Sequence, residues 1–112
     1  AAGSVTAAIT RARAHSGHMV KIEIEVDSLA QLDEALGQRA DTILLDNMTP
    51  ERLREAVKMT AGRATLEASG SVNERTIAAI AATGVDYISS GAITHSAKCL
   101  DVALDLESDV RP

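Results

Sequence analysis

Polar groups that could bind a phosphorylated ligand recur along the sequence, each at the end of a strand-like segment. Their spacings are 21, 23 and 21 residues, and they are Glu25, Asp46, Ser69–Gly70 and Ser90–Gly91. Carboxylates at such positions can stabilise cationic charge or meet ligand hydroxyls. A serine–glycine pair lets the backbone approach an anion, and the N-terminus of a following helix offers N–H groups to it. The near-equal spacing predicts that all four groups lie at the same height in successive structural units.

The segments that must position these groups alternate between strand and helix with a period of about 22 residues. Strands are predicted at 21–26, 42–47, 65–70 and 87–91. Helix starts are predicted at Ser4, at Ser28 with Gln31, at Thr49–Pro50 and at Ser71 with Glu74. This alternation predicts an α/β fold with a parallel sheet and right-handed crossovers. The short connections leave no room for a domain boundary.

Strand parity places several carboxylates on one face of this sheet. In the first strand the isoleucines alternate with Glu23 and Glu25, and in the third strand Leu66 and Ala68 alternate with Glu67. If helices cover the apolar face, the glutamates point into a barrel interior. Two interpretations stay open for Glu23 and Glu25, because an edge strand would expose them to water. The carboxyl ends of parallel strands are where α/β proteins bind ligands.

Composition excludes several classes of function. The formal net charge of −5 disfavours nucleic acid as a partner, and Tyr87 is the only aromatic residue, so there is no stacking platform for single strands. Cys99 is a lone cysteine, which fits a cytoplasmic protein. We expect no membrane partner, because no apolar run reaches the length of a bilayer span. The chain lacks an initiator methionine and is expected to be a piece of something longer.

Four runs of this sequence resemble quinolinate phosphoribosyltransferase, also called nicotinate-nucleotide pyrophosphorylase (carboxylating). The runs are KIEIEVDSLAQLDEAL (21–36), ILLDNMTP (43–50), LEASG (66–70) and TGVDYISSGAITHS (83–96). The tail LDVALDL (100–106) and the start AGSV (2–5) add to the match. The resemblance follows the family's order over nearly the whole chain. It implies that residues 1–112 form one unit, the C-terminal half of a (β/α) barrel with parallel strands.

The resemblance also implies an activity and a set of site residues. Such enzymes transfer phosphoribose from phosphoribosyl pyrophosphate to quinolinate, release pyrophosphate and carbon dioxide, and need Mg²⁺. Glu25 and Asp46 would be the catalytic carboxylates, which meet the ribose hydroxyls and the pyrophosphate. The residues against the 5-phosphate would be Ser69, Gly70, Ser71, Ser90, Gly91 and Ala92. Whether Glu25 and Asp46 contact the metal directly is left open, and a homo-oligomer, a dimer or larger, is expected.

Two alternatives to this transferase stay open from the residues alone. Another phosphate-binding (β/α) barrel enzyme, such as an isomerase or lyase, would share the serine–glycine site but should not need both Glu25 and Asp46. A half-barrel that acts only as an assembly module would need no catalytic residues. The family's basic residues for the quinolinate carboxylates come from upstream segments that this chain lacks. We therefore expect the chain alone to be inactive as a transferase.

Overall fold

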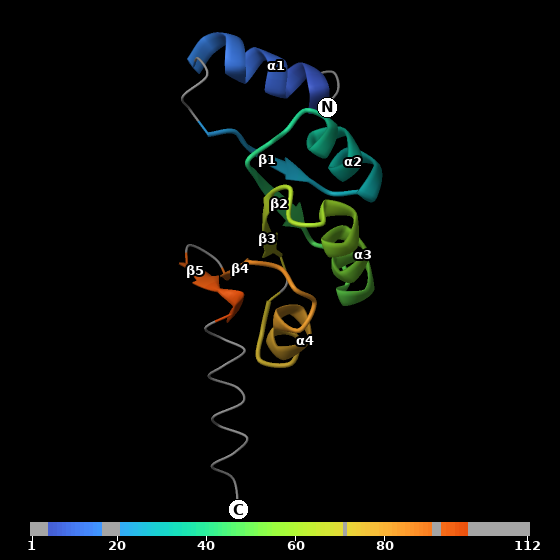
Figure 1. Ribbon diagram of the computed structural model, residues 1–112. Coiled ribbons are helices and arrows are strands. Elements are labelled where there is room, and N and C mark those ends of the chain that lie inside the picture. Colours follow the sequence, from blue (N-terminus) through green and yellow to red (C-terminus); the bar gives the residue numbers. More distant parts are fainter. Residues whose placement is uncertain (1–4, 17–20, 71, 91–92, 99–112) are drawn as a thin grey trace, which may run out of the picture.

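The computed structural model of this protein describes residues 5–16, 21–70, 72–90 and 93–98. Its elements are α1 (Val5–Ser16), β1 (Glu23–Val26), α2 (Leu29–Gly37), β2 (Thr42–Asp46), α3 (Pro50–Thr60), β3 (Thr65–Ser69), α4 (Ile77–Ala81), β4 (Tyr87–Ser90) and β5 (Ile93–Ser96). One sheet contains the strands in the order β1-β2-β3-β4-β5. The first four strands pair in parallel, and β5 pairs antiparallel with β4. Helices α2, α3 and α4 lie along one side of the sheet (Figure 1). The predicted α/β fold with successive parallel strands is confirmed.

The predicted starts of α2 and α3 are confirmed by their caps. The Ser28 hydroxyl accepts from the Gln31 backbone N–H at 3.2 Å, and the Gln31 side chain accepts in return from the N–H of Asp27 at 2.8 Å. The Thr49 hydroxyl accepts from the Arg52 N–H at 3.3 Å, and proline follows at the first helical position. Both caps satisfy backbone donors that a helix start leaves without an intrahelical partner. Each helix therefore begins directly after the end of its strand.

The start of α4 differs from the prediction. This helix begins only at Ile77, and Ser71, the predicted cap, lies outside the described residues. The carboxamide oxygen of Asn73 accepts from the backbone N–H groups of Arg75, at 2.8 Å, and Thr76, at 3.1 Å. Bonds from the N–H groups two and three residues ahead are those of a helix N-cap, so Asn73 caps the turn that leads into α4. The chain therefore makes a turn at Asn73 before the helix starts.

The sheet also contains a strand that was not predicted, β5. Strand β5 covers β4, with Tyr87 opposite Ser96 and Ser90 opposite Ile93. Within the described residues, β1 is then one edge of the sheet and β5 the other. The sequence pattern had indicated strand only up to residue 91, because the glycine there reads as a turn.

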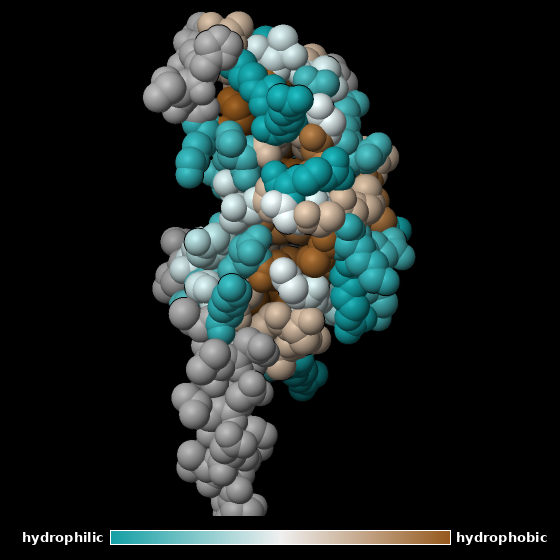
Figure 2. All heavy atoms as spheres, in the orientation of Figure 1, coloured by the Kyte–Doolittle hydropathy of each residue, from teal (hydrophilic) through white to brown (hydrophobic). Residues whose placement is uncertain are grey.

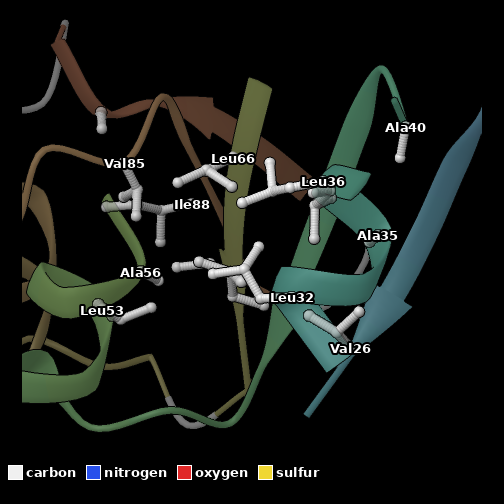
Figure 3. Packing of buried hydrophobic residues seen from close by; sticks show 14 of the residues in the cluster. Val26, Leu32, Ala35, Leu36, Ala40, Leu53, Ala56, Leu66, Val85 and Ile88 are labelled. Atoms are coloured by element: carbon white, nitrogen blue, oxygen red, sulfur yellow. The ribbon is translucent and has the colours of Figure 1, made fainter. Parts of the chain in front are cut away.

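The hydrophobic core lies between the sheet and helices α2, α3 and α4. Ile43 and Leu45 of β2 are fully buried, as are Leu32 of α2 and Ala56 of α3. Figure 3 shows side chains of the strands and the helices meeting in this layer. Hydrophilic residues cover much of the side seen in Figure 2, with hydrophobic ones visible between them. No described helix is long and apolar enough to cross a membrane.

Two aspartates connect neighbouring strands at the amino end of the sheet in the same way. Asp41 donates its backbone N–H to the Ile22 carbonyl at 2.9 Å and accepts from the Ile22 N–H through Oδ2 at 2.6 Å. Asp86 repeats both bonds with Leu66, each at 2.9 Å. Each aspartate directly precedes its own strand, and its carboxylate accepts from a backbone N–H in the preceding strand or directly before it. We infer that these hydrogen bonds help to set the register of β2 with β1 and of β4 with β3.

Asp86→Ala is expected to lower the free energy of unfolding by about 1 kcal/mol, because the Leu66 N–H loses its acceptor. Asp86→Asn keeps an acceptor oxygen and should retain most of the stability. Asp33→Ala, which removes an exposed carboxylate from α2, serves as the control. Urea unfolding followed by circular dichroism measures all three variants. Equal stability of the Asp86→Ala and Asp33→Ala variants would show that the Asp86 bond contributes nothing.

Candidate functional site

The face of the sheet that points away from the helices carries the acidic and hydroxyl side chains. Along β2 and β3 the buried residues alternate with half-buried ones, and Asp46, Glu67 and Ser69 belong to the half-buried set. On β1, Glu23 and Glu25 are exposed and share this parity. We call this surface the open face. Of the two interpretations of Glu23 and Glu25, the exposed edge strand is the one observed, and both residues nevertheless share a face with Glu67.

The predicted equal height of the polar groups is only partly right. Asp46 and Ser69 are register partners, so they lie side by side at the carboxyl ends of β2 and β3. Glu25, however, pairs with Leu44, two residues before Asp46. It therefore lies roughly 6–7 Å nearer the amino end of the sheet. Equal sequence spacing fails here because the helices and loops between strands differ in length, so the pairing of the strands, and not the count of residues, decides the height.

A close backbone contact joins the ends of β2 and β3. Asn47, with φ of 53°, donates its backbone N–H to the Ser69 carbonyl at 2.9 Å. Gly70 follows with φ of 119°, and a Cβ placed on it would lie 2.9 Å from Asn47 Cα. Real Cβ atoms do not approach backbone so closely, so this position requires glycine. The sequence prediction included Gly70 as a site residue but missed Asn47. An asparagine at the end of a strand-like segment is the signal that could have identified it.

In the loop after Gly70, two backbone N–H groups that were predicted to be open to an anion already have acceptors. Val72 donates its N–H to the Gly70 carbonyl at 2.8 Å, and Asn73 donates its N–H to the Thr76 hydroxyl at 3.0 Å. Both donors are therefore already used within the loop. Any anion at this turn would have to meet the backbone closer to Gly70.

The end of β4 presents two serines to opposite faces. Ile88 is buried on the helix side, so Ser90 shares that side and Ser89 belongs to the open face. Ser90 is exposed at the last position of the strand. The other predicted phosphate residues, Ser71, Gly91 and Ala92, lie outside the described residues. The structure thus brings Ser89, which was not predicted, onto the face of the carboxylates.

Ser89 contacts two other strands through its hydroxyl. It donates a hydrogen bond to Oε2 of Glu67 on β3, and its Oγ lies 3.4 Å from Oγ1 of Thr94 on β5. Glu67 and Ser89 are both half-buried, and Thr94 is exposed. Parity predicted that Glu67 lies on this face, but no sequence pattern predicted its hydrogen bond.

His95 does not contribute to the open face. It lies in β5 opposite Ile88, which places it on the helix side of the sheet, where it is exposed. The side chain of His15 and the whole of His18 lie outside the described residues. Within the described part of the chain, no three His, Cys, Asp or Glu residues form a group able to hold a metal ion.

Two cavities lie at opposite ends of the sheet. At the carboxyl end, a cavity of about 280 Å³ between α3 and α4 is lined by Asn47 and Ser69 together with core residues such as Leu53 and Ile80. It lies on the helix side, and neither Glu25 nor Asp46 lines it. At the amino end, a second cavity of about 420 Å³ is lined by Lys21, Asp41, Thr42, Gly62, Arg63, Ala64, Thr65 and Asp86. The carboxylates of the open face therefore lie on an open surface rather than in either of these cavities.

Comparisons with known proteins agree on one family. The model of the family "Quinolinate phosphoribosyl transferase, C-terminal domain" matches residues 1–105. A probable nicotinate-nucleotide pyrophosphorylase (carboxylating) of Bacillus subtilis is 42% identical over 106 residues, which cover 95% of this chain and 37% of the relative. The nicotinate-nucleotide pyrophosphorylase (carboxylating) of Mycobacterium leprae is 43% identical over 109 residues, 95% of this chain and 38% of the relative. The chain thus spans little more than a third of these relatives.

Solved structures give the same result. The nicotinate-nucleotide pyrophosphorylase of Ehrlichia chaffeensis superposes with a TM-score of 0.75 at 46% identity, over 80% of this chain and 32% of that one. The enzyme of that name from Francisella tularensis superposes with a TM-score of 0.75 at 41% identity, over 86% of this chain and 34% of that one. Sequence and structure comparisons therefore each match about a third of the same kind of protein.

Proposed function

Since this chain belongs to the quinolinate phosphoribosyl transferase family, we propose that it forms the C-terminal half of a (β/α) barrel enzyme of NAD biosynthesis. The reaction is transfer of phosphoribose from phosphoribosyl pyrophosphate to quinolinate. The pyridine nitrogen bonds to ribose C1 while the bond from C1 to the pyrophosphate oxygen breaks. The 2-carboxylate then leaves as CO2, and its ring carbon takes up a proton. The products are nicotinate mononucleotide, pyrophosphate and carbon dioxide.

One observation carries this proposal: Asp46 and Glu25 share a face of the sheet with Ser69, which is followed by the glycine turn at Gly70. Asp46 and Ser69 are side by side, and Gly70 is packed against the residue that follows Asp46. Glu25 lies on the same face, lower on the neighbouring strand.

The carboxylates stabilise charge in this proposal. Breaking the bond at C1 develops positive charge on the ribose ring, and Glu25 and Asp46 would oppose it electrostatically. They would also accept hydrogen bonds from the ribose hydroxyls, which orients C1 toward the pyridine nitrogen. No general base has to activate the nucleophile, because the nitrogen lone pair attacks directly.

The serine–glycine turns hold the 5-phosphate in this proposal. Ser69, Gly70 and Ser71 would meet it after β3, and Ser90, Gly91 and Ala92 after β4. Gly70 supports the assignment because its backbone conformation and its contact with Asn47 require a glycine, which has no side chain to block an anion. A bare backbone is what an anion needs for close approach.

Magnesium fits the donor set of this face. Mg²⁺ is commonly bound by one or two carboxylates together with substrate phosphates and water, rather than by a full protein cage. Asp46 and Glu25 provide two such carboxylates, and the described residues form no three-ligand metal group. When bound, the ion would neutralise the departing pyrophosphate. We propose that Asp46 and Glu25 would hold it.

Cytoplasmic location and a homodimer or larger oligomer stay predictions that accompany this function. The cations that bind the two quinolinate carboxylates are proposed to come from the upstream part of the barrel. A partner segment of that kind would also cover the edge of β1, which is uncovered among the described residues.

A chimeric enzyme tests the proposed function. The chain replaces the segment that it matches in the Bacillus subtilis relative, which supplies the remaining length. We expect the chimera to form nicotinate mononucleotide from quinolinate and phosphoribosyl pyrophosphate, and the 112-residue chain alone to form none. The relative without its matching segment is the control. A folded chimera without product, or an active isolated chain, would contradict the proposal.

A further inference from the structure

We propose that Ser89 is a positioning residue that holds the Glu67 carboxylate toward the ribose. This inference rests on the proposed function, because Glu67 acts on the substrate and Ser89 acts through Glu67. Glu67 becomes a third carboxylate of the open face, beside Glu25 and Asp46. Three successive strands thus each contribute at least one carboxylate to the same face.

The register of the strands shows in which direction Ser89 holds Glu67. Glu67 pairs with Tyr87, so Ser89 lies two residues nearer the carboxyl end of the neighbouring strand. Its hydrogen bond to Oε2 therefore draws the carboxylate diagonally toward that end. Asp46 and Ser69 lie at the same end of β2 and β3. Without this bond, the side chain of Glu67 could turn toward the amino end, away from the ligand.

The single proton of the Ser89 hydroxyl fixes the direction of its two hydrogen bonds. A serine hydroxyl has one proton, and Ser89 donates it to Glu67. The contact between Ser89 Oγ and Thr94 Oγ1, at 3.4 Å, must then have Thr94 as its donor. Ser89 is held between β3 and β5 in this way. Oε2 of Glu67 is used in the bond, which leaves Oε1 as the acceptor for a ribose hydroxyl or a developing cation.

The position of Glu67 explains why it needs a fixed partner. It is half-buried in an inner strand, whereas Glu25 is exposed on the edge strand. A carboxylate contributes most to catalysis when it is already oriented before charge develops on the substrate. A hydrogen bond from a residue on a neighbouring strand supplies this orientation before the reaction, so the carboxylate does not have to reorient as charge develops.

Variants of the chimeric enzyme test this inference. Ser89→Ala is expected to lower kcat roughly tenfold, on the scale known for groups that orient ligating side chains. KM for quinolinate should stay unchanged, and Ser89→Thr, which keeps the hydroxyl, should restore kcat. In a Glu67→Gln background, Ser89→Ala should have no further effect, because Ser89 acts only through Glu67. Thr42→Ala, which removes a half-buried hydroxyl of the open face at the amino end, is the control.

Three outcomes overturn the inference. The first is a Ser89→Ala chimera as active as the unsubstituted one, and the second is an effect of Ser89→Ala that persists in full in the Glu67→Gln background. The third comes from the 112-residue chain itself. There, Ser89→Ala should shift the ¹³C resonance of the Glu67 carboxyl carbon, and an unmoved resonance refutes the contact. An inactive unsubstituted chimera would instead overturn the proposed function, which separates the two failures.

Discussion

Asp46→Asn is expected to lower kcat of the chimeric enzyme by roughly 100- to 1,000-fold, the range seen when a group that stabilises transition-state charge is removed. The asparagine side chain has nearly the same shape, so the register pairing with Ser69 should be kept. What is lost is the negative charge that opposes the positive ribose and helps hold magnesium. The loss should appear mainly in kcat, because this charge acts most strongly as the bond to pyrophosphate breaks. Steady-state kinetics with saturating phosphoribosyl pyrophosphate measures it.

Asp33→Asn is the matched control for this variant. It removes the same charge from an exposed position on α2, on the other side of the sheet, and should leave kcat unchanged. Glu25→Gln should behave like Asp46→Asn. If the folded Asp46→Asn chimera keeps activity close to that of the control, the catalytic carboxylate lies elsewhere.

Gly70→Ala is expected to lower the free energy of unfolding by roughly 2–5 kcal/mol. Two costs combine at this position. The φ of 119° is unfavourable for alanine, and its Cβ would lie 2.9 Å from Asn47 Cα and 3.1 Å from Asn47 N. The backbone of Asn47 must move to relieve this clash, which breaks its bond to Ser69 and displaces the adjacent Asp46.

Gly62→Ala separates the two costs, because Gly62 also has a positive φ, of 79°, but has no atom within 4 Å of a placed Cβ. This variant should lose only the part that comes from backbone conformation, about 1 kcal/mol. Urea unfolding of both variants gives the difference. Equal losses in the two variants would mean that the contact between Gly70 and Asn47 does not constrain the turn.

Features that depend on local sequence could be predicted from the residues alone. The caps at Ser28 and Thr49 involve residues within four positions of one another, and both are confirmed. The alternation of buried and half-buried residues along β2 and β3 follows from the period of a strand. The fold class follows from these local patterns, because alternating strands and helices have few ways to pack.

Features that depend on pairing between strands could not be predicted in the same way. Glu25 lies lower on the sheet than Asp46 because of the register between β1 and β2. A helix and two loops separate these strands in the sequence, so local patterns do not reveal their register. Strand β5 pairs antiparallel after a glycine that signals only a turn. The choice of Ser89 over Ser90 for the open face depends on where Ile88 is buried, and both serines look alike in the sequence.

The central claim is that the ligand binds at the carboxyl end of the sheet, on the open face. Titration of the ¹⁵N-labelled 112-residue chain with phosphoribosyl pyrophosphate and Mg²⁺ tests it most directly, because each amide reports its own surroundings. The account predicts that the amides of Asp46, Asn47 and Gly70 shift with the ligand, and that those lining the amino-end cavity, such as Asp41, Arg63 and Asp86, do not. Shifts confined to the amino-end cavity, with the carboxyl end unmoved, would contradict it.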